Sequence, residues 1–75
     1  MNITFQLKEK EDVIKLNKIA TNYMFDIWVH TEDQMLDAKT LLALYTLPFN
    51  QDLRLVIEEG VNSKALLRDM EPFMK

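Results

Sequence analysis

The chain has 75 residues, of which 48% are hydrophobic, with one glycine, two prolines, no cysteine and a formal net charge of −3. This composition predicts one small folded domain spanning residues 1–75, and it excludes disulfides and thiolate metal sites. The nine Lys and Arg residues are scattered along the chain, whereas duplex binding needs clustered cations, so nucleic acid is not expected as a partner.

The amino-terminal segment alternates between apolar and polar residues, which predicts a half-buried strand. Its apolar positions are Ile3, Phe5 and Leu7. Val13, Leu16 and Ala20 then fall on one stripe at helical spacing, which predicts a helix from Glu9 to Thr21. Acidic residues at its start and lysines further along suit the helix dipole.

The middle of the chain predicts a hairpin followed by a short helix. Residues 25–30 alternate again, with Phe25, Ile27 and Val29 facing the core. A turn over residues 31–33 leads into a short returning strand over residues 34–36. Asp37 is the expected N-cap of a helix over residues 38–45, which Pro48 ends.

The last third predicts a strand and a helix. Residues 53–57 form a strand whose inward positions are Leu53, Leu55 and Ile57, and Gly60 turns the chain. Asn62 or Ser63 caps a final helix that Pro72 limits to a frayed or kinked last turn. Its apolar residues are Ala65, Leu66, Met70 and Phe73. The order β-α-β-β-α-β-α predicts an α+β fold with helices covering one face of a mostly antiparallel sheet.

This order and the central run resemble HPr, the histidine-containing phosphocarrier protein of the bacterial sugar phosphotransferase system. The pieces that carry the resemblance are Ile27-x-Val29, the run Asp37-Ala38-Lys39-Thr40-Leu41-Leu42-x-Leu44-x-x-Leu47, and Leu53-x-Leu55-x-Ile57, all at the family's spacing. The resemblance implies an HPr-like open-faced β-sandwich, in which three helices cover one face of a four-stranded antiparallel sheet.

The phosphoacceptor sequence of the family is missing. An HPr carries a Gly-x-His-x-Arg-Pro type sequence between the first strand and the first helix, and its histidine accepts phosphoryl from enzyme I. Counted without gaps from Ile27, the glycine, histidine, arginine and proline positions here are Leu7, Glu9, Glu11 and Asp12. Because neighbouring carboxylates repel a phosphoryl group, we expect no phosphocarrier activity. We also expect no enzymatic activity, and no cofactor or metal.

Two interpretations fit the acidic residues Glu9, Glu11 and Asp12. They form a permanent negative patch that imitates a phosphorylated relative, or they only stabilise the first turn of a helix, typically by about 0.3–1 kcal/mol each. The single histidine, His30, is either a displaced phosphoacceptor or a polar residue at a strand end on the solvent face, and the second interpretation is favoured.

Other candidate sites come from the resemblance and from expected exposure. Thr40 matches the position of a regulatory serine in many family members, so it is a candidate phosphorylation site or only a helix-capping residue. Leu42, Leu47 and Phe49 lie where the family uses apolar residues to dock partners, so they form a contact surface or belong to a short helix that is merely well covered. Trp28 is expected on the outward face of the sheet beside Arg54 and Val56, as a contact residue or as cross-strand packing.

The leading hypothesis is therefore an HPr-like binding or regulatory partner in sugar transport or its control, without phosphocarrier activity. The alternatives are a phosphocarrier that uses Glu9 or His30 as acceptor, and a self-associating structural module that uses Trp28 and the sheet face. We expect a cytoplasmic protein, because no apolar run approaches the roughly 18 residues that span a bilayer and the first residues do not resemble a signal peptide. The sequence leaves the protein partner and the oligomeric state open.

Overall fold

The elements of the structure follow the predicted order. The computed structural model describes residues 2–74. The strands are β1 (Asn2–Phe5), β2 (Ile27–His30), β3 (Met35–Asp37) and β4 (Leu53–Ile57). The helices are α1 (Lys10–Thr21), α2 (Leu41–Leu44), α3 (Lys64–Met70) and a final 3-10 turn, η1 (Glu71–Phe73). Among residues 2–74, no helix is long and apolar enough to cross a bilayer.

The four strands form one antiparallel sheet in the order β1-β4-β2-β3. The last strand in sequence, β4, therefore lies inside the sheet, with Leu55 paired to Ile3 on one side and to Val29 on the other. Because side chains alternate between faces along a strand, this register puts the apolar residues of all three strands on the same face. The α+β prediction with a four-stranded antiparallel sheet is confirmed.

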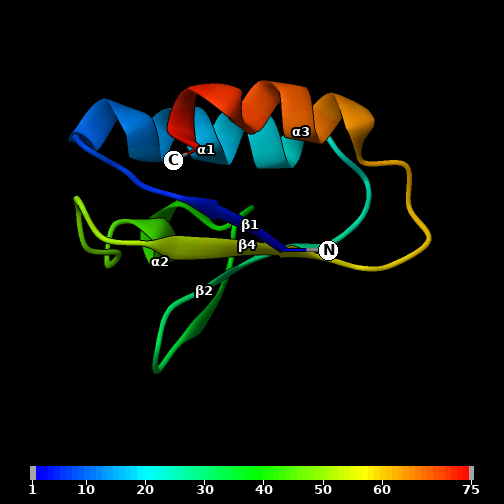
Figure 1. Ribbon diagram of the computed structural model, residues 1–75. Helices are drawn as coiled ribbons and strands as arrows, with labels where there is room; N and C mark the ends of the chain where they lie inside the picture. Colours follow the sequence, from blue (N-terminus) through cyan, green and yellow to red (C-terminus); the bar gives the residue numbers. More distant parts are fainter. Residues whose placement is uncertain (1, 75) are drawn as a thin grey trace.

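The helices close the core from one side. Figure 1 shows α1 and α3 lying together over one face of the sheet. The short helix α2 contacts α1 and β3. The buried face of the sheet and the helix stripes meet in one cluster that includes Phe5, Leu16, Leu55, Leu66 and Met70, each at most 1% exposed. Burying such a side chain is worth about 1.5–3 kcal/mol, so these contacts fix how the layers face each other.

The second helix is shorter than predicted, and the expected N-cap is wrong. Asp37 ends β3, and the N-cap of α2 is Thr40. The backbone N–H of Ala38 donates to the carbonyl of Ile27, which keeps Ala38 with the sheet, and that of Thr40 donates to the carbonyl of Asp37. The Asp37 carboxylate accepts from the N–H of Lys39, so a tight turn takes the place of a first helical turn.

Three strand boundaries also differ from the sequence-based prediction, since β1 ends at Phe5 and β3 covers residues 35–37 rather than 34–36. The second strand begins at Ile27 rather than Phe25, whose ring instead packs on that of Tyr23 at a centroid distance of 5.3 Å. The last helix ends at Met70 and continues as η1, which contains Pro72. Ala65 was expected on the apolar stripe of this helix but is exposed. Gly60 has the positive φ (88°) that its predicted turn requires.

Candidate functional site

The junction between β1 and α1 is held by backbone hydrogen bonds from distant parts of the chain. The N–H of Gln6 donates to the carbonyl of Phe73 at 3.0 Å, and the N–H of Asn50 donates to the carbonyl of Leu7 at 2.8 Å. Asn50 has a positive φ of 59°, which asparagine tolerates better than most residues. The Leu7 side chain is fully buried. The chain is therefore fixed just before the acidic start of α1.

Asp12 caps the start of α1. Its carboxylate accepts the backbone N–H of Lys8 at 2.9 Å and that of Glu9 at 3.4 Å, while its own N–H donates to the Glu9 carbonyl. Glu9 is the N-cap residue, with extended backbone. Glu9 and Glu11 are exposed, whereas Asp12 is half-buried. Asp12 thus has a definite structural role in capping the helix, whereas Glu9 and Glu11 are exposed.

A pocket of about 710 Å³ runs from this junction along α1 toward η1. Lysine side chains from Lys8, Lys15 and Lys18 line it together with Glu9, and Ile19 and Phe73 supply apolar surface. Sequence reasoning expected Glu9 to meet only carboxylates and missed these cations. Helical spacing could have indicated that lysines lie near the acidic residues, because Asp12, Lys15 and Ile19 follow one another along one side of a helix. Asp12 and Asp69 also line the pocket, so its formal charges balance.

Tyr23 links the end of α1 to α3 beside this pocket. Its hydroxyl donates to the Asp69 carboxylate at 2.6 Å. This hydrogen bond, with smaller effects of burial and of the Asp69 charge, raises the pKa of Tyr23 to about 12. A neutral tyrosine is the donor that the contact needs, so the interaction is a structural tie between the two helices.

The second candidate surface lies around α2. Leu42 is 79% exposed, Tyr45 42% and Phe49 44%, and we call these three residues the α2 patch. Leu47 was predicted to belong to the docking surface, but that prediction is wrong. Its side chain is only 5% exposed and belongs to the core cluster, because the turn after α2 directs it inward with Leu44.

Thr40 is exposed at the start of α2. Its carbonyl accepts the N–H groups of Ala43 and Leu44, so its backbone opens the helix. Its hydroxyl makes no capping hydrogen bond, so the side chain does not contribute the cap that was one interpretation of this residue. The neighbouring Lys39 is half-buried.

His30 and Trp28 lie on the other face of the sheet. Ile27 and Val29 are buried beneath the helices, and the residues that alternate with them point away from α1. Trp28 pairs with Val56, and His30 pairs with Arg54. The structure therefore does not bring His30 to the start of α1, and it agrees with the predicted position of Trp28 beside Val56.

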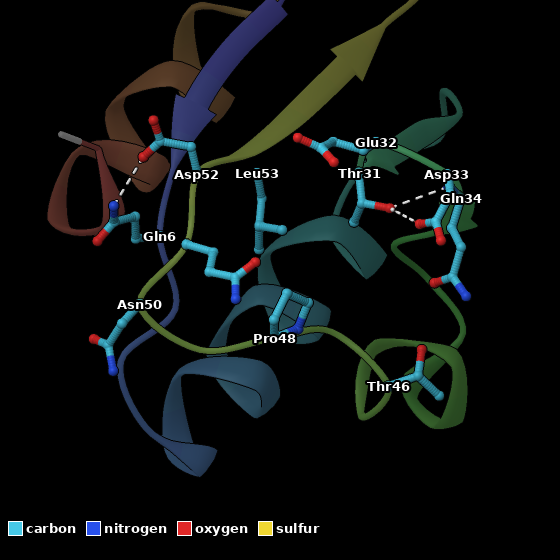
Figure 2. Close-up of a pocket in the computed structure, with 11 residues that line it drawn as sticks. Gln6, Thr31, Glu32, Asp33, Gln34, Thr46, Pro48, Asn50, Asp52 and Leu53 are labelled. Carbon is cyan, nitrogen blue, oxygen red and sulfur yellow. Dashed lines mark hydrogen bonds between the residues drawn. The ribbon is translucent and has the colours of Figure 1, made fainter.

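A polar hollow of about 630 Å³ opens between the β2–β3 turn and the loop before β4 (Figure 2). Its polar groups bond to one another: the Gln6 amide donates to Asp52 at 2.8 Å, and the Thr31 hydroxyl bonds to Asp33 and to the N–H of Gln34. Glu32 adds a further carboxylate. Among residues 2–74, no cluster of His, Cys, Asp or Glu could hold a metal ion. The acidic lining does not suit a phosphate group.

Comparison with solved structures decides the fold. The crystal structure of HPr-C-His from Thermoanaerobacter tengcongensis superposes with a TM-score of 0.73, covering 93% of this chain and 89% of that one. The chain has the HPr fold. At 19% sequence identity, the likeness concerns the fold alone. No family model matches the sequence, and no curated protein matches it either.

Within this HPr fold, the start of α1 carries Glu9, Glu11 and Asp12 and no histidine, since the single histidine of the chain is His30. The exposed apolar residues of the α2 patch lie elsewhere, on α2 and on the turn that follows it.

Proposed function

We propose that this protein is an HPr-like binding or regulatory partner in sugar transport or its control, and that it does not carry phosphoryl groups. One observation supports the proposal most. In this HPr fold the N-cap residue of α1 is Glu9 and not a histidine. An imidazole accepts a phosphoryl group through an unprotonated nitrogen, and the chain offers none at this junction.

The α2 patch supports the binding part of the proposal. HPr proteins dock partners through apolar residues around the second helix, and Leu42, Tyr45 and Phe49 are exposed here. Leaving a leucine 79% exposed gains nothing for the fold, whereas covering it in a complex removes apolar surface from water. The expected partner is a protein component or regulator of the phosphotransferase system.

A second candidate function is an unconventional phosphocarrier. Lys8, Lys15 and Lys18 line the same pocket as Glu9, and cations of this kind would favour an anionic group on that carboxylate. Three features weaken this candidate: the three carboxylates in the pocket offset the lysines, a carboxylate is a poorer acceptor than imidazole at neutral pH, and His30 lies on the opposite face of the sheet.

The decisive experiment is incubation with enzyme I and phosphoenolpyruvate, followed by intact-mass measurement, with an authentic HPr as positive control. We expect the mass of this protein to stay unchanged while the control gains a phosphoryl group. A stoichiometric adduct would overturn the proposal. The acceptor would then be identified by its loss in Glu9→Gln or in His30→Ala.

The binding part has its own test. A 15N-labelled sample titrated with phosphotransferase-system proteins should show shifts centred on the α2 patch. Leu42→Ser and Phe49→Ser should weaken binding at least tenfold. Met35→Ser is the matched control, because Met35 is also exposed (58%) but lies on β3 and not on α2. Equal loss of binding in all three variants would contradict the assignment of the surface.

A further inference from the structure

The face of the sheet turned away from α1 and α3 carries an ordered pattern of side chains. On the two inner strands, Trp28 and His30 of β2 and Arg54 and Val56 of β4 point to this face, because the residues between them are buried under the helices. The register pairs Trp28 with Val56 and His30 with Arg54. The pairs form two neighbouring rows across the strands, one apolar and one basic.

A third row lies on the other side of the apolar pair. Asp26 precedes β2 and Glu58 follows β4, and since Ile27 pairs with Ile57, these two acidic residues come side by side. Together with Trp28 and Val56 they line a shallow hollow of about 230 Å³. Along the strands the open face therefore reads acidic, apolar, basic.

Within one copy, the acidic row places the like charges of Asp26 and Glu58 next to each other. Directly opposed like charges on neighbouring strands are destabilising. Beyond the basic row, Glu32 and Asp52 line a hollow with Arg54, and the Asp52 carboxylate accepts a hydrogen bond from the Gln6 amide.

We propose that this open sheet face binds a second copy of the same chain. A two-fold axis running along the apolar row turns one sheet over onto the other and reverses the strand direction. The acidic row of each copy then faces the basic row of the other. Arg54 meets Glu58 of the second copy, His30 meets Asp26, and Trp28 stacks on Trp28. On the two inner strands the pattern is its own complement under this rotation, which favours a second copy over an unrelated protein.

The size of the face sets the strength of this dimer. Four strands at about 4.8 Å spacing and five residues at about 3.4 Å give roughly 320 Å² of sheet per copy. A standard interface buries about 800 Å² per partner, so this dimer is a weak one, with an expected dissociation constant between about 10 μM and 1 mM. It is concentration-dependent and leaves the α2 patch open, so it stands apart from the proposed function.

Sedimentation velocity across this concentration range tests the proposal, with emission of the single tryptophan as a second signal. We expect a monomer–dimer equilibrium and a change in Trp28 emission on association. Arg54→Glu and Glu58→Arg should each weaken association at least tenfold, because each variant leaves like charges facing each other. Arg68→Glu is the control, since Arg68 is exposed on α3 in the opposite layer, and it should leave association unchanged.

An equimolar mixture of Arg54→Glu and Glu58→Arg is the sharpest measurement. In the mixed dimer both contacts between positions 54 and 58 pair opposite charges, so association should return to the wild-type level. A protein that stays monomeric at about 1 mM would overturn the proposal. So would a dimer that survives both single substitutions, or a mixture that associates no better than its components.

Discussion

The start of α1 and the α2 patch differ in whether their side chains have partners within the fold. At the start of α1, Asp12 accepts two backbone N–H groups, and the Leu7 side chain is buried completely. In the α2 patch, Leu42 and Phe49 are largely exposed. Leu7 and Asp12 stabilise the fold through burial and helix capping, whereas the exposed apolar side chains of the α2 patch do not. The comparison separates residues that build the fold from residues available for contact.

Replacing Leu7 should produce the largest effect. The Leu7 side chain is fully buried in the core, so Leu7→Ala should lower the free energy of unfolding by about 2–5 kcal/mol. Urea denaturation measures the loss, and Leu42→Ala is the control for removing the same side chain from an exposed site. Equal losses of stability in the two variants would contradict the assignment of Leu7 to the core and of Leu42 to the surface.

The cap at Asp12 should matter less. Asp12→Ala removes the acceptor for the N–H groups of Lys8 and Glu9 and should cost about 1 kcal/mol of unfolding free energy. Glu11→Ala, one residue earlier and exposed, is the matched control and should cost less than half as much. Equal losses in thermal denaturation would show that only the general charge of the first turn matters.

Tyr23, which follows α1, should make the stability of the folded protein depend on pH. Its pKa is raised to about 12 from 10.0 by the hydrogen bond to Asp69, so the neutral form is stabilised in the folded protein. The resulting stability is fully present below pH 10 and is lost as the pH rises from 10 to 12. Absorbance titration of a Tyr45→Phe background isolates Tyr23, and adding Asp69→Asn should lower its pKa toward 10. An unchanged titration would remove Asp69 as the cause.

Substitutions in the α2 patch should change stability least. Leu42→Ser alters a side chain that is 79% exposed, so the free energy of unfolding should stay within about 0.5 kcal/mol of the wild-type value. Urea denaturation of the same samples used for binding measures this directly. A loss above 1 kcal/mol, about twice the usual scatter for surface sites, would assign the patch to the core instead.

Much of the fold and part of the site could be predicted from local patterns. The alternation in residues 2–7 and the helical stripe of Val13, Leu16 and Ala20 gave the right element types, and β4 has the predicted bounds. The predicted helix after Asp37 was too long, because an aspartate before an apolar run can open a helix or close a tight turn. Only the bonds from Lys39 and Thr40 to Asp37 decide between them.

The sequence by itself determined the order of the elements, the buried face of most strands and helices, and the absence of a histidine from the start of α1. These follow from residue identity and from the periods of strands and helices. The tertiary structure decided that Leu47 is buried, that Lys15 and Lys18 share a pocket with Glu9, and that Trp28 lies against Val56. The pairing of Trp28 with Val56 depends on the register between β4 and β2, which are far apart in the chain, and no local pattern encodes that register.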